Sequence, residues 1–362
     1  MKVGVLFGGR SVEHNISVIS ARAVADALRA KHHECVYIRI DQQGAWHLMD
    51  AVVSPDVSAT TDPNIDRGRE LMLVPAGGAH KSLYLPQEQK YVEVDVIFPV
   101  LHGSYGEDGI IQGTLDACTL RYVGGGVIPS VLTNDKDITK RLLRESGIAI
   151  AEYFCFRKNN DSLYAGALNK DEQVINKYYD EISSKLQLPF WIKPANLGSS
   201  LGISQVTGPE NFIAAILEAF ALDDKIIVEE HLEGREMECS VLEDKTGITV
   251  SLPGEIILND RSFYDYDAKY TDKDAATLAI PADVTDDISL RIKEVAAKVF
   301  MILENRHIMR LDIFLTKEDK IIVNEVQTIP GFTSISMYPK LLDVAGVSLP
   351  ELVDRLVVAT CE

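Results

Sequence analysis

The chain has 362 residues, of which 46% are hydrophobic and 25% charged, values that are typical of a folded globular protein and too apolar for a disordered one. Its 36 basic and 54 acidic side chains give a formal net charge of −18, which argues against nucleic acid and anionic membrane surfaces as partners. The apolar runs are far shorter than the roughly 20 residues of a membrane span, and the N-terminus lacks the pattern of a signal peptide. We therefore expect a cytoplasmic protein of two or three domains.

The five cysteines are odd in number, widely spaced and never arranged as CxxC pairs. This spacing argues against a disulfide framework and against a structural zinc site. We expect reduced thiols at all five positions, which are Cys35, Cys118, Cys155, Cys239 and Cys361.

The N-terminal part of the chain alternates between strand and helix patterns. Residues 2–7 form a β-rich run that ends at two glycines, and the apolar residues of 17–30 recur with helical spacing. Strands are also predicted over 35–40 and 94–100. Residues 54–80 are rich in Pro, Asp, Thr and Gly and predict a surface excursion. Together these features predict an α/β domain.

A glycine cluster at 122–129 ends this pattern, and a helix is predicted after it over 134–146, with Gly147 as its stop. Residues 188–206 then predict a strand, a glycine-rich loop and a second strand. Further strands are predicted at 226–231, 236–241, 310–315 and 321–326, the last two joined as a hairpin. This order predicts an α/β unit followed by α+β units, with domains at 1–123, 124–230 and 231–362.

The glycine-rich loop is a candidate anion site. Lys193 ends an apolar strand five residues before Gly198, which two serine hydroxyls follow. Small residues let backbone N–H groups approach an anion closely, and the lysine adds a positive charge, so the segment suits phosphate. It lacks the GxxxxGK[ST] pattern of a Walker loop. An ordinary glycine hairpin remains the alternative.

The predicted hairpin near the C-terminus is a candidate metal site. Arg310 and Asp312 share one face of their strand, and Glu325 and Gln327 share one face of theirs. If the two faces coincide, the carboxylates oppose each other, which is destabilising unless a cation lies between them. Magnesium binds oxygen ligands, so two carboxylates and a carboxamide make a suitable set. A solvated charged hairpin is the alternative.

Two glycine-rich segments follow apolar strands, at the edge where α/β sheets bind their ligands. Residues 102–109 combine three glycines with charged side chains, and they can also be a turn that caps a helix. Residues 8–14 occupy the equivalent place after the first strand, but they do not supply GxGxxG, which disfavours a dinucleotide site. The pair His32–His33 is interpreted as a polar helix end.

These pieces, in this order, match one family. The matching motifs are GGRSVEHNIS near residue 8, LHGSYGEDGIIQG from Leu101, NDK at 134–136, KPANLGSSLGIS from Lys193, VEEHLEGREMECSV from Val228, FYDYDAKY from Phe263, and RLDIFL with NEVQTIPGFTSISMYPKL toward the C-terminus. The chain resembles the D-alanine:D-alanine ligases of the ATP-grasp superfamily, and the likeness runs from Gly8 to Leu341.

The resemblance implies a three-domain ATP-grasp architecture, α/β and α+β, with an N-terminal doubly wound α/β domain. It implies that ATP binds between the central and C-terminal domains and that the dipeptide site faces the N-terminal domain. Two Mg²⁺ ions, with Mn²⁺ as a substitute, are the expected metals. The expected partners are D-alanine, ATP and a second copy of the chain in a homodimer.

The resemblance also implies a role for each matching residue. Lys136, Lys193 and Lys269 would contact the nucleotide phosphates, Glu229, Glu230 and Leu232 the adenine edge, and Glu236 the ribose. Asp312 and Glu325, with Gln327, would hold the metals. Glu13 would receive the ammonium of the first D-alanine, His102 would lie near the substrate carboxylates, and Ser336 and Met337 would line the second site. Tyr270 would close over the substrates, linked to Ser199 and Glu13.

The implied reaction suits these residue types. A carboxylate is a poor electrophile, so ATP is expected to phosphorylate one D-alanine carboxylate while lysines and magnesium neutralise the phosphoryl oxygens. The amine of a second D-alanine then attacks the acyl phosphate. Arg310 and the backbone N–H of Gly331 are expected to stabilise the tetrahedral oxyanion. A lid over the site is expected because acyl phosphates hydrolyse.

One residue departs from the family pattern N-E-[VI]-N-T-x-P-G. The second asparagine is Gln327 here, which keeps the carboxamide but moves its oxygen one methylene further out. Magnesium tolerates little distortion of its octahedron, so we expect ligation to persist with a higher metal requirement.

Three other functions stay open at this stage. A ligase that uses D-serine as second substrate is the nearest one. A D-lactate ligase is disfavoured because the resemblance associates a tyrosine at position 270 with dipeptide formation. A catalytically silent nucleotide-binding paralogue is suggested only by Gln327.

Overall fold

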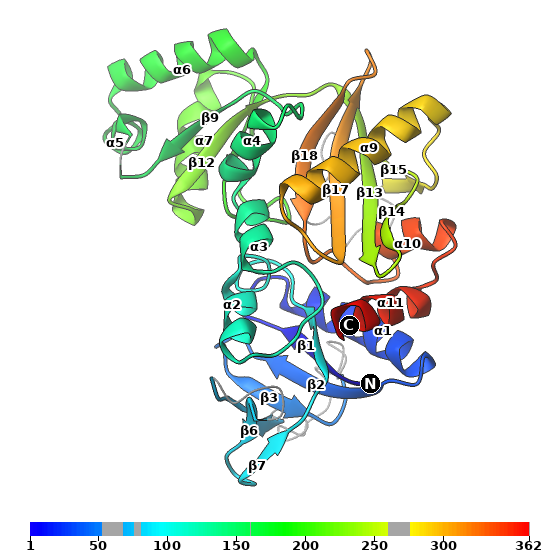
Figure 1. The fold of residues 1–362 in the computed structure, drawn as a ribbon. Helices are drawn as coiled ribbons and strands as arrows, with labels where there is room; N and C mark the ends of the chain where they lie inside the picture. Colours follow the sequence, from blue (N-terminus) through cyan, green and yellow to red (C-terminus); the bar gives the residue numbers. More distant parts are fainter. Residues whose placement is uncertain (53–67, 76–80, 160, 260–275, 362) are drawn as a thin grey trace.

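The computed structural model describes residues 1–52, 68–75, 81–159, 161–259 and 276–361. This part of the chain forms three units that are each built on a β-sheet (Figure 1). The N-terminal unit lies at the bottom of Figure 1, and the central and C-terminal units lie side by side above it. The predicted combination of α/β and α+β units is confirmed.

The N-terminal unit is a five-stranded sheet in the order β4–β3–β2–β1–β8. Its strands are β1 (Lys2–Gly8), β2 (Glu34–Ile40), β3 (Trp46–Met49), β4 (Arg69–Glu70) and β8 (Val96–Val100). Strand β1 runs parallel to β2 and β8, so the carboxyl ends of these strands meet at one edge. Helix α1 (His14–Ala30) packs on one face and α2 (Ile110–Ala117) on the other, as a doubly wound sheet requires.

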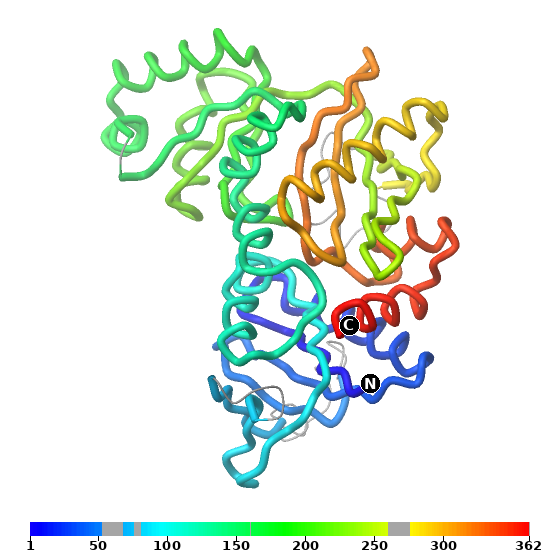
Figure 2. The backbone as a smooth tube through the Cα atoms, in the orientation of Figure 1, coloured from blue at the N-terminus to red at the C-terminus, as the bar shows by residue number. Residues whose placement is uncertain are grey.

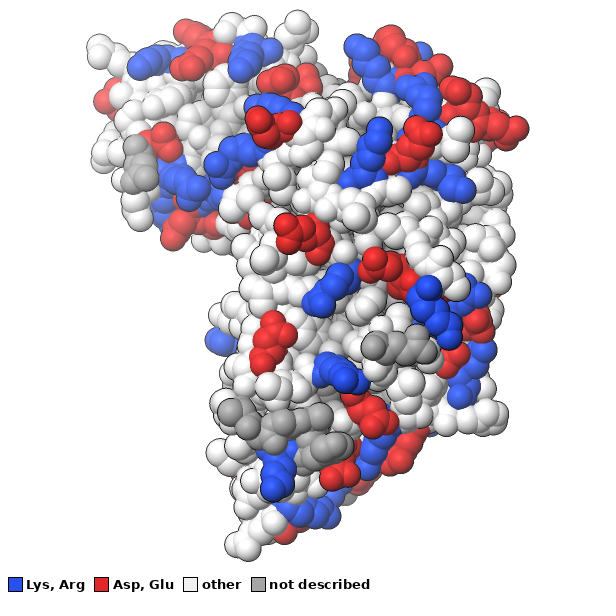
Figure 3. Space-filling model, in the orientation of Figure 1, with Lys and Arg blue, Asp and Glu red and all other residues white. Residues whose placement is uncertain are grey.

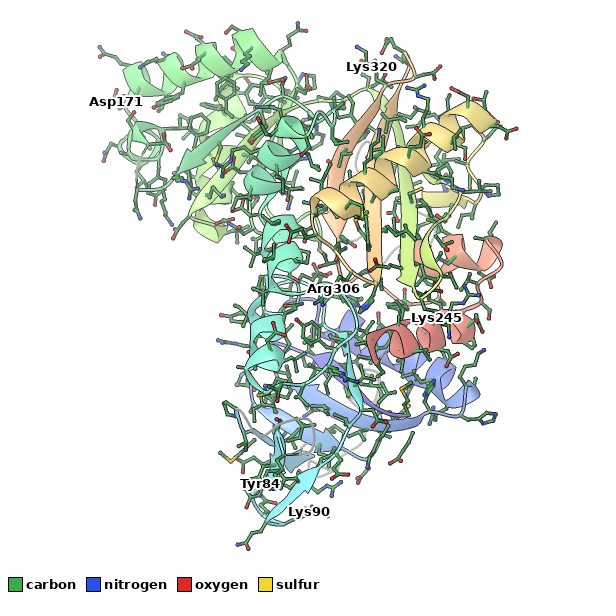
Figure 4. All side chains as sticks on the ribbon, in the orientation of Figure 1. Tyr84, Lys90, Asp171, Lys245, Arg306 and Lys320 are labelled. Atoms are coloured by element: carbon green, nitrogen blue, oxygen red, sulfur yellow. The ribbon has the colours of Figure 1, made fainter. Side chains whose placement is uncertain are left out.

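A small sheet, β5–β6–β7, extends this unit. Its strands are Met72–Leu73, Leu83–Leu85 and Lys90–Val92. The side chains of Leu83 and Leu85 are buried in the same core as α2, while Tyr84 and Lys90 mark the lower end of the molecule in Figure 4. Most of the surface excursion predicted over 54–80 lies outside the described residues.

The central unit is an antiparallel sheet in the order β11–β10–β12–β9. Its elements are β9 (Tyr153–Arg157), α5 (Ser162–Asn169), α6 (Glu172–Leu186), β10 (Phe190–Pro194), β11 (Ser204–Val206), α7 (Pro209–Leu222) and β12 (Lys225–Glu230). The three helices bury an aromatic-rich core against the sheet. The predicted strand, glycine loop and strand over 188–206 are confirmed as β10 and β11.

The helix predicted over 134–146 is confirmed, although it begins two residues later, and a helix that was not predicted precedes it. The structure has two helices there, α3 (Val127–Asn134) and α4 (Lys136–Glu145). Asp135 separates them because its backbone is extended and its side chain accepts the N–H groups of Asp137 and Ile138 as the N-cap of α4. Helix α3 escaped prediction because it follows the glycine cluster and contains Pro129, which a first helical turn tolerates.

The C-terminal unit is a sheet in the order β16–β15–β13–β17–β18, with β14 paired to β13. Its elements are β13 (Gly234–Asp244), β14 (Gly247–Val250), β15 (Gly254–Leu258), β16 (Ala276–Ala279), α9 (Asp286–Ile302), β17 (Ile308–Thr316), β18 (Ile321–Gln327) and α10 (Met337–Val344). Helix α9 covers one face. The predicted hairpin is confirmed as β17 and β18, with Lys320 at its tip (Figure 4).

The last helix, α11 (Leu349–Cys361), leaves the C-terminal sheet and packs against α1. Figure 2 shows this red segment beside the blue N-terminal helix. Leu352 and Leu356 share a buried core with Leu28, and Lys31 pairs with Glu351 at 2.5 Å. The division at 1–123, 124–230 and 231–362 stays a prediction, but by its contacts α11 belongs to the N-terminal core.

The surface carries both signs of charge. Acidic and basic side chains are intermixed over the face shown in Figure 3. Among the described residues, no helix is long and apolar enough to cross a membrane. All five cysteines are free thiols, as predicted, and Cys118 and Cys239 are buried.

The packing of α11 gives a first prediction. Leu356 is fully buried, so Leu356→Ala should lower the free energy of unfolding by about 2–5 kcal/mol, measured by urea denaturation. Leu290→Ala on α9 is the control, because that side chain is 57% exposed and its loss should change stability by less than about 0.5 kcal/mol. Equal effects of the two substitutions would contradict the docking of α11.

Candidate active site

Two cavities lie against the C-terminal sheet and meet at the glycine-rich loop. The nucleotide cavity, as we call the first, has a volume of about 450 Å³ and lies between the central and C-terminal sheets. The substrate cavity has about 460 Å³ and lies between the C-terminal sheet and the N-terminal unit. Both are lined by Gly198, Ser199, Glu238 and Ile256.

Every predicted site residue that the structure describes lines one of these two cavities. The nucleotide cavity is lined by Lys136, Lys193, Ser199, Glu229, Glu230, Leu232, Glu236, Asp312 and Glu325. The substrate cavity is lined by Glu13, His102, Ser199, Arg310, Gln327, Gly331, Ser336 and Met337. Lys269 and Tyr270 lie outside the described residues. Lys193 and Glu325 therefore share one cleft although 132 residues separate them in the chain.

A buried carboxylate holds two lysines at the base of the nucleotide cavity. Glu229 on β12 contacts Lys193 on β10 at 2.5 Å, and it also pairs with Lys140 on α4. Burial acts to raise the pKa of Glu229, but the charges of Lys140 and Lys193 outweigh it and lower the pKa to about 2. Burial also lowers the pKa of Lys140 below its usual value, despite the opposing charge of Glu229. Lys140 was not predicted as a site residue, although it lies one helical turn after Lys136.

Lys136 connects the glycine-rich loop to the acidic hairpin. As the first residue of α4, it donates a hydrogen bond from Nζ to the carbonyl oxygen of Leu197 at 2.5 Å. Its Nζ lies 3.8 Å from a carboxylate oxygen of Glu325. Positive groups from α4 and β10 and acidic groups from β17 and β18 thus face one cavity.

The register of the hairpin agrees with the prediction. Asp312 lies opposite Glu325, and Arg310 lies opposite Gln327. The next strand adds Glu238, which lies opposite Asp312, so three carboxylates form a row across β13, β17 and β18. Glu238 was missed, although it shares a strand face with Glu236 two residues earlier.

Arg310 neutralises this row. Its guanidinium donates to both carboxylate oxygens of Asp312 at 2.7 Å, and its Nε lies 3.0 Å from Oε2 of Glu238. Burial alone would lower the pKa of Arg310, but the charges of Asp312, Glu238 and Glu325 raise the pKa well above the usual value. The arginine is therefore a permanent cation at the border of the two cavities.

The carboxylates fit a magnesium site in which phosphate oxygens would supply the remaining ligands. Asp312 and Glu325 face each other in the nucleotide cavity and offer only oxygen atoms. Within the described ranges, no group of three or more His, Cys, Asp or Glu residues could hold a metal by itself. Gln327 lines the substrate cavity rather than the nucleotide cavity, so its role as a ligand stays a prediction.

A hydrogen bond joins the N-terminal unit to the glycine-rich loop at the substrate cavity. Ser199 of the glycine-rich loop donates from Oγ to Oε1 of Glu13, which follows β1, at 2.6 Å. Gly103 makes room for this contact, because a Cβ atom there would lie 2.5 Å from the Glu13 carboxylate. The glycine-rich segments after β1 and β8 therefore meet at the cavity, as their places after the strands predicted.

His102 is buried beside two carboxylates. Its Nδ1 donates to the carbonyl oxygen of Ile329 at 3.2 Å, and its Nε2 lies 3.0 Å from Ser20 Oγ. Burial acts to lower the pKa of His102, but the carboxylate of Glu107, 3.8 Å from Nδ1, and the charge of Glu13 outweigh it and raise the pKa. A positively charged imidazole at this place suits a substrate carboxylate.

The opposite wall of the substrate cavity is formed by the loop before α10. Ser336 Oγ accepts the backbone N–H of Thr333 at 3.0 Å, and Met337 is the first residue of the helix. A Cβ atom on Gly331 would lie 2.6 Å from Ser336 Oγ, so only glycine brings this backbone so close to the serine.

Family models match both parts of the chain. The model described as D-ala D-ala ligase N-terminus matches residues 2–125, and the model described as D-ala D-ala ligase C-terminus matches residues 142–358. The chain belongs to the D-alanine–D-alanine ligase family. The predicted resemblance and the ATP-grasp architecture are confirmed.

Individual members of the D-alanine–D-alanine ligase family match over almost their full length. The D-alanine–D-alanine ligase A of Escherichia coli K12 is 39% identical over 361 residues, which are 99% of this chain and 94% of that protein. The structure of the D-alanine–D-alanine ligase from Coxiella burnetii matches with a TM-score of 0.81 at 30% identity, covering 100% and 94% of the two chains. The VanG D-Ala:D-Ser ligase of Enterococcus faecalis also matches, with a TM-score of 0.81, 31% identity and 98% of each chain covered.

The Glu229 cluster gives a second prediction. Glu229→Gln removes the partner of two lysines in the nucleotide cavity and should lower the free energy of unfolding by about 3–5 kcal/mol at pH 7. Because the pKa of folded Glu229 is about 2, below its usual 4.5, its contribution is complete above pH 4.5 and is lost as the pH falls through about 2. The stability difference between the two proteins should therefore shrink with acid.

Urea denaturation between pH 7 and pH 3 measures this difference. Glu233→Gln is the control, because Glu233 pairs with Lys317 at the surface and its loss should leave the unfolding midpoint unchanged. A Glu229→Gln protein as stable as the wild type at pH 7 would show that the cluster does not stabilise the fold.

Proposed function

We propose that this protein is an ATP-dependent ligase that joins two D-alanine molecules to D-alanyl-D-alanine for peptidoglycan synthesis. The observation that carries the proposal is the continuity of the two cavities. The nucleotide cavity contains Lys136 and Lys193 opposite Asp312 and Glu325. The substrate cavity contains Glu13, which is hydrogen-bonded to Ser199 at the border of the two cavities. A phosphoryl group can thus pass from nucleotide to substrate across their common border.

ATP would bind in the nucleotide cavity. Lys136 and Lys193 would contact its phosphates, while Glu229, Glu230 and Leu232 would lie at the adenine edge and Glu236 at the ribose. Lys193 is neutralised by Glu229 in the structure, so phosphate oxygens would compete with Glu229 for this ammonium group. Lys269 is proposed for the γ-phosphate from the resemblance alone.

Asp312, Glu325 and Gln327 would hold two Mg²⁺ ions, with Mn²⁺ as a substitute. When bound, such ions would neutralise negative charge on the phosphate oxygens. Arg310 donates to both oxygens of Asp312 in the structure, so a cation bound to Asp312 would share these oxygens with the guanidinium or displace it from one of them.

The substrate cavity would bind both amino acids. Glu13 would receive the ammonium group of the first D-alanine and His102 would attract its carboxylate, while Ser336 and Met337 would line the second site. The carboxylate of the first D-alanine would accept the γ-phosphoryl group of ATP. The amine of the second D-alanine would then attack this acyl phosphate and release phosphate. Arg310 and the Gly331 N–H would stabilise the tetrahedral oxyanion, where one donor is worth roughly 3–4 kcal/mol.

D-serine as second substrate is the alternative function, because a structure similar to this chain is a D-Ala:D-Ser ligase. A D-lactate ligase is disfavoured by Tyr270, and a silent paralogue by the retention of both lysines and both carboxylates. A homodimer and a cytoplasmic location complete the proposal. Tyr270 would close over the substrates, linked to Ser199 and Glu13.

The third prediction is the reaction itself. In the presence of ATP and Mg²⁺, D-alanine should be the only amino acid needed for phosphate release. Chromatography with mass analysis should identify the product as D-alanyl-D-alanine. Parallel reactions contain D-alanine with D-serine or with D-lactate. A mixed product formed in preference to the dipeptide would change the assigned substrate, and no turnover at saturating Mg²⁺ would indicate a silent paralogue.

Variants of the acidic hairpin sharpen this assay. Asp312→Asn and Glu325→Gln should each lower kcat/KM by about 100-fold or more, because each removes a negative charge that would hold a metal ion beside the phosphates. Asp319→Asn is the matched control, since it changes an exposed carboxylate in the turn of the same hairpin and should retain wild-type activity. Equal activity of all three variants would place the phosphate site elsewhere.

The fourth prediction concerns Gln327. Gln327→Asn restores the family pattern and the shorter reach of the carboxamide, so it should lower the Mg²⁺ concentration for half-maximal activity by a few-fold. Mg²⁺ titration at saturating ATP and D-alanine measures this value. An unchanged or higher requirement would contradict ligation of the metal by residue 327.

A further inference from the structure

Glu238 lies where the nucleotide cavity meets the substrate cavity, and none of the roles derived above uses it. Its carboxylate is buried, with 7% of the side chain exposed, and it lines both cavities. Strand pairing places it in one row with Asp312 and Glu325. A buried carboxylate beside two others costs free energy unless a cation compensates it, so this residue needs an explanation.

The compensating cation is Arg310. Its guanidinium lies between two acidic partners, with both oxygens of Asp312 at 2.7 Å and Oε2 of Glu238 at 3.0 Å from Nε. Arg310 itself is opposite Ser240 and Gln327 in the ladder, so its side chain leans along the strand toward the row of carboxylates. The two acidic partners hold it from adjacent strands.

The two partners have different fates in the proposed reaction. Asp312 faces Glu325 and would bind a cation, which would draw on the same carboxylate charge that holds Arg310. Glu238 lies on β13, one strand further from Glu325, and its Oε2 lies 3.0 Å from Nε, whose single N–H is donated to Asp312 in the structure, so Glu238 is placed to accept this N–H when Asp312 releases it. A buried guanidinium that loses one carboxylate stays in place only if a second one retains it.

We propose that Glu238 is a positioning residue that holds the Arg310 guanidinium at the border of the two cavities while Asp312 serves the cation. The inference rests on the proposed ligase function, because it concerns the arginine that faces the reacting carboxylate. Without the charge of Glu238, the guanidinium stays on Asp312. This position misplaces the oxyanion donor, and it leaves the guanidinium on a carboxylate that would bind the metal. The chemical step suffers, whereas the nucleotide contacts on β10, β12 and α4 are unaffected.

The test compares Glu238→Gln, Glu238→Asp and the wild type in steady-state kinetics with ATP, D-alanine and Mg²⁺. We expect Glu238→Gln to lower kcat by about 10- to 100-fold, with the KM for ATP changed by less than twofold. Glu238→Asp keeps the charge and should recover at least part of the lost kcat. Glu243→Gln on the same strand is the control and should keep wild-type kinetics, since Glu243 lines neither cavity and its carboxylate accepts the backbone N–H of His307 at 3.0 Å.

Other outcomes would overturn the inference in distinct ways. Wild-type kcat in Glu238→Gln would show that the arginine needs no second carboxylate. A rise in the half-saturating Mg²⁺ concentration with unchanged kcat at saturation would make Glu238 a metal ligand instead. Equal losses in the Gln and Asp variants, with a lowered thermal unfolding midpoint in both, would indicate a purely structural role.

A crystal structure of the wild type with Mg²⁺ and a non-hydrolysable ATP analogue separates this inference from the proposed function. The guanidinium is expected on Glu238, with Asp312 turned to the metal. A guanidinium that remains bidentate on Asp312 would overturn the role of Glu238 and leave the ligase assignment intact. A wild type that neither turns over nor binds the analogue would overturn the proposed function and this inference with it.

Discussion

Buried charges that neutralise one another across neighbouring strands are the interaction on which the site depends. Glu229 can remain ionised in the interior because Lys140 and Lys193 face it. The buried charge of Arg310 is compensated in the same way by Asp312 and Glu238. Each cluster joins elements that are distant in sequence. Phosphates, cations and amino acids would bind to these same ammonium, guanidinium and carboxylate groups. A ligand would therefore replace an existing ion pair within the protein and would not bind to an unpaired charge.

The three units contribute different parts of this arrangement. The central sheet supplies lysines through α4 and β10, the C-terminal sheet supplies carboxylates, and the N-terminal unit supplies Glu13. Ser199 and Lys136 are the connecting residues, since one bonds to Glu13 and the other lies between the Leu197 carbonyl and Glu325. A shift of one unit would therefore change the nucleotide and substrate cavities together.

Local patterns were sufficient for the long strands of each sheet and for the acidic hairpin, but not for β3 to β7, β9 or β14 to β16. The alternation of residues 310–315 and 321–326, with the short turn between them, predicted the hairpin, and it put Asp312 opposite Glu325 on the condition that the two faces coincide, which they do. The pairing of β13 with β17 could not be predicted in this way, because it brings Glu238 next to residues more than 70 positions later. The contact of Lys140 with Glu229 was missed for the same reason.

Two further differences have local and long-range causes. The predicted helix begins only at Lys136 because the side chain of Asp135 caps α4. The last helix was not predicted, and no local pattern identifies its partner, which is the first helix of the chain. The functional roles came from the resemblance, whereas Glu238 became visible only through the three-dimensional register.

The position of α11 has a consequence for how the polypeptide acquires its shape. The side chains of Leu352, Val353 and Leu356 complete the apolar cover of α1, so the first sheet to leave the ribosome lacks part of its interior until α11 has been synthesised. Strands β1 and β2 therefore stay incompletely covered while the two later units are made. Ribosome-bound chains that stop before residue 349 should for this reason expose the apolar flank of α1 to chaperones and proteases.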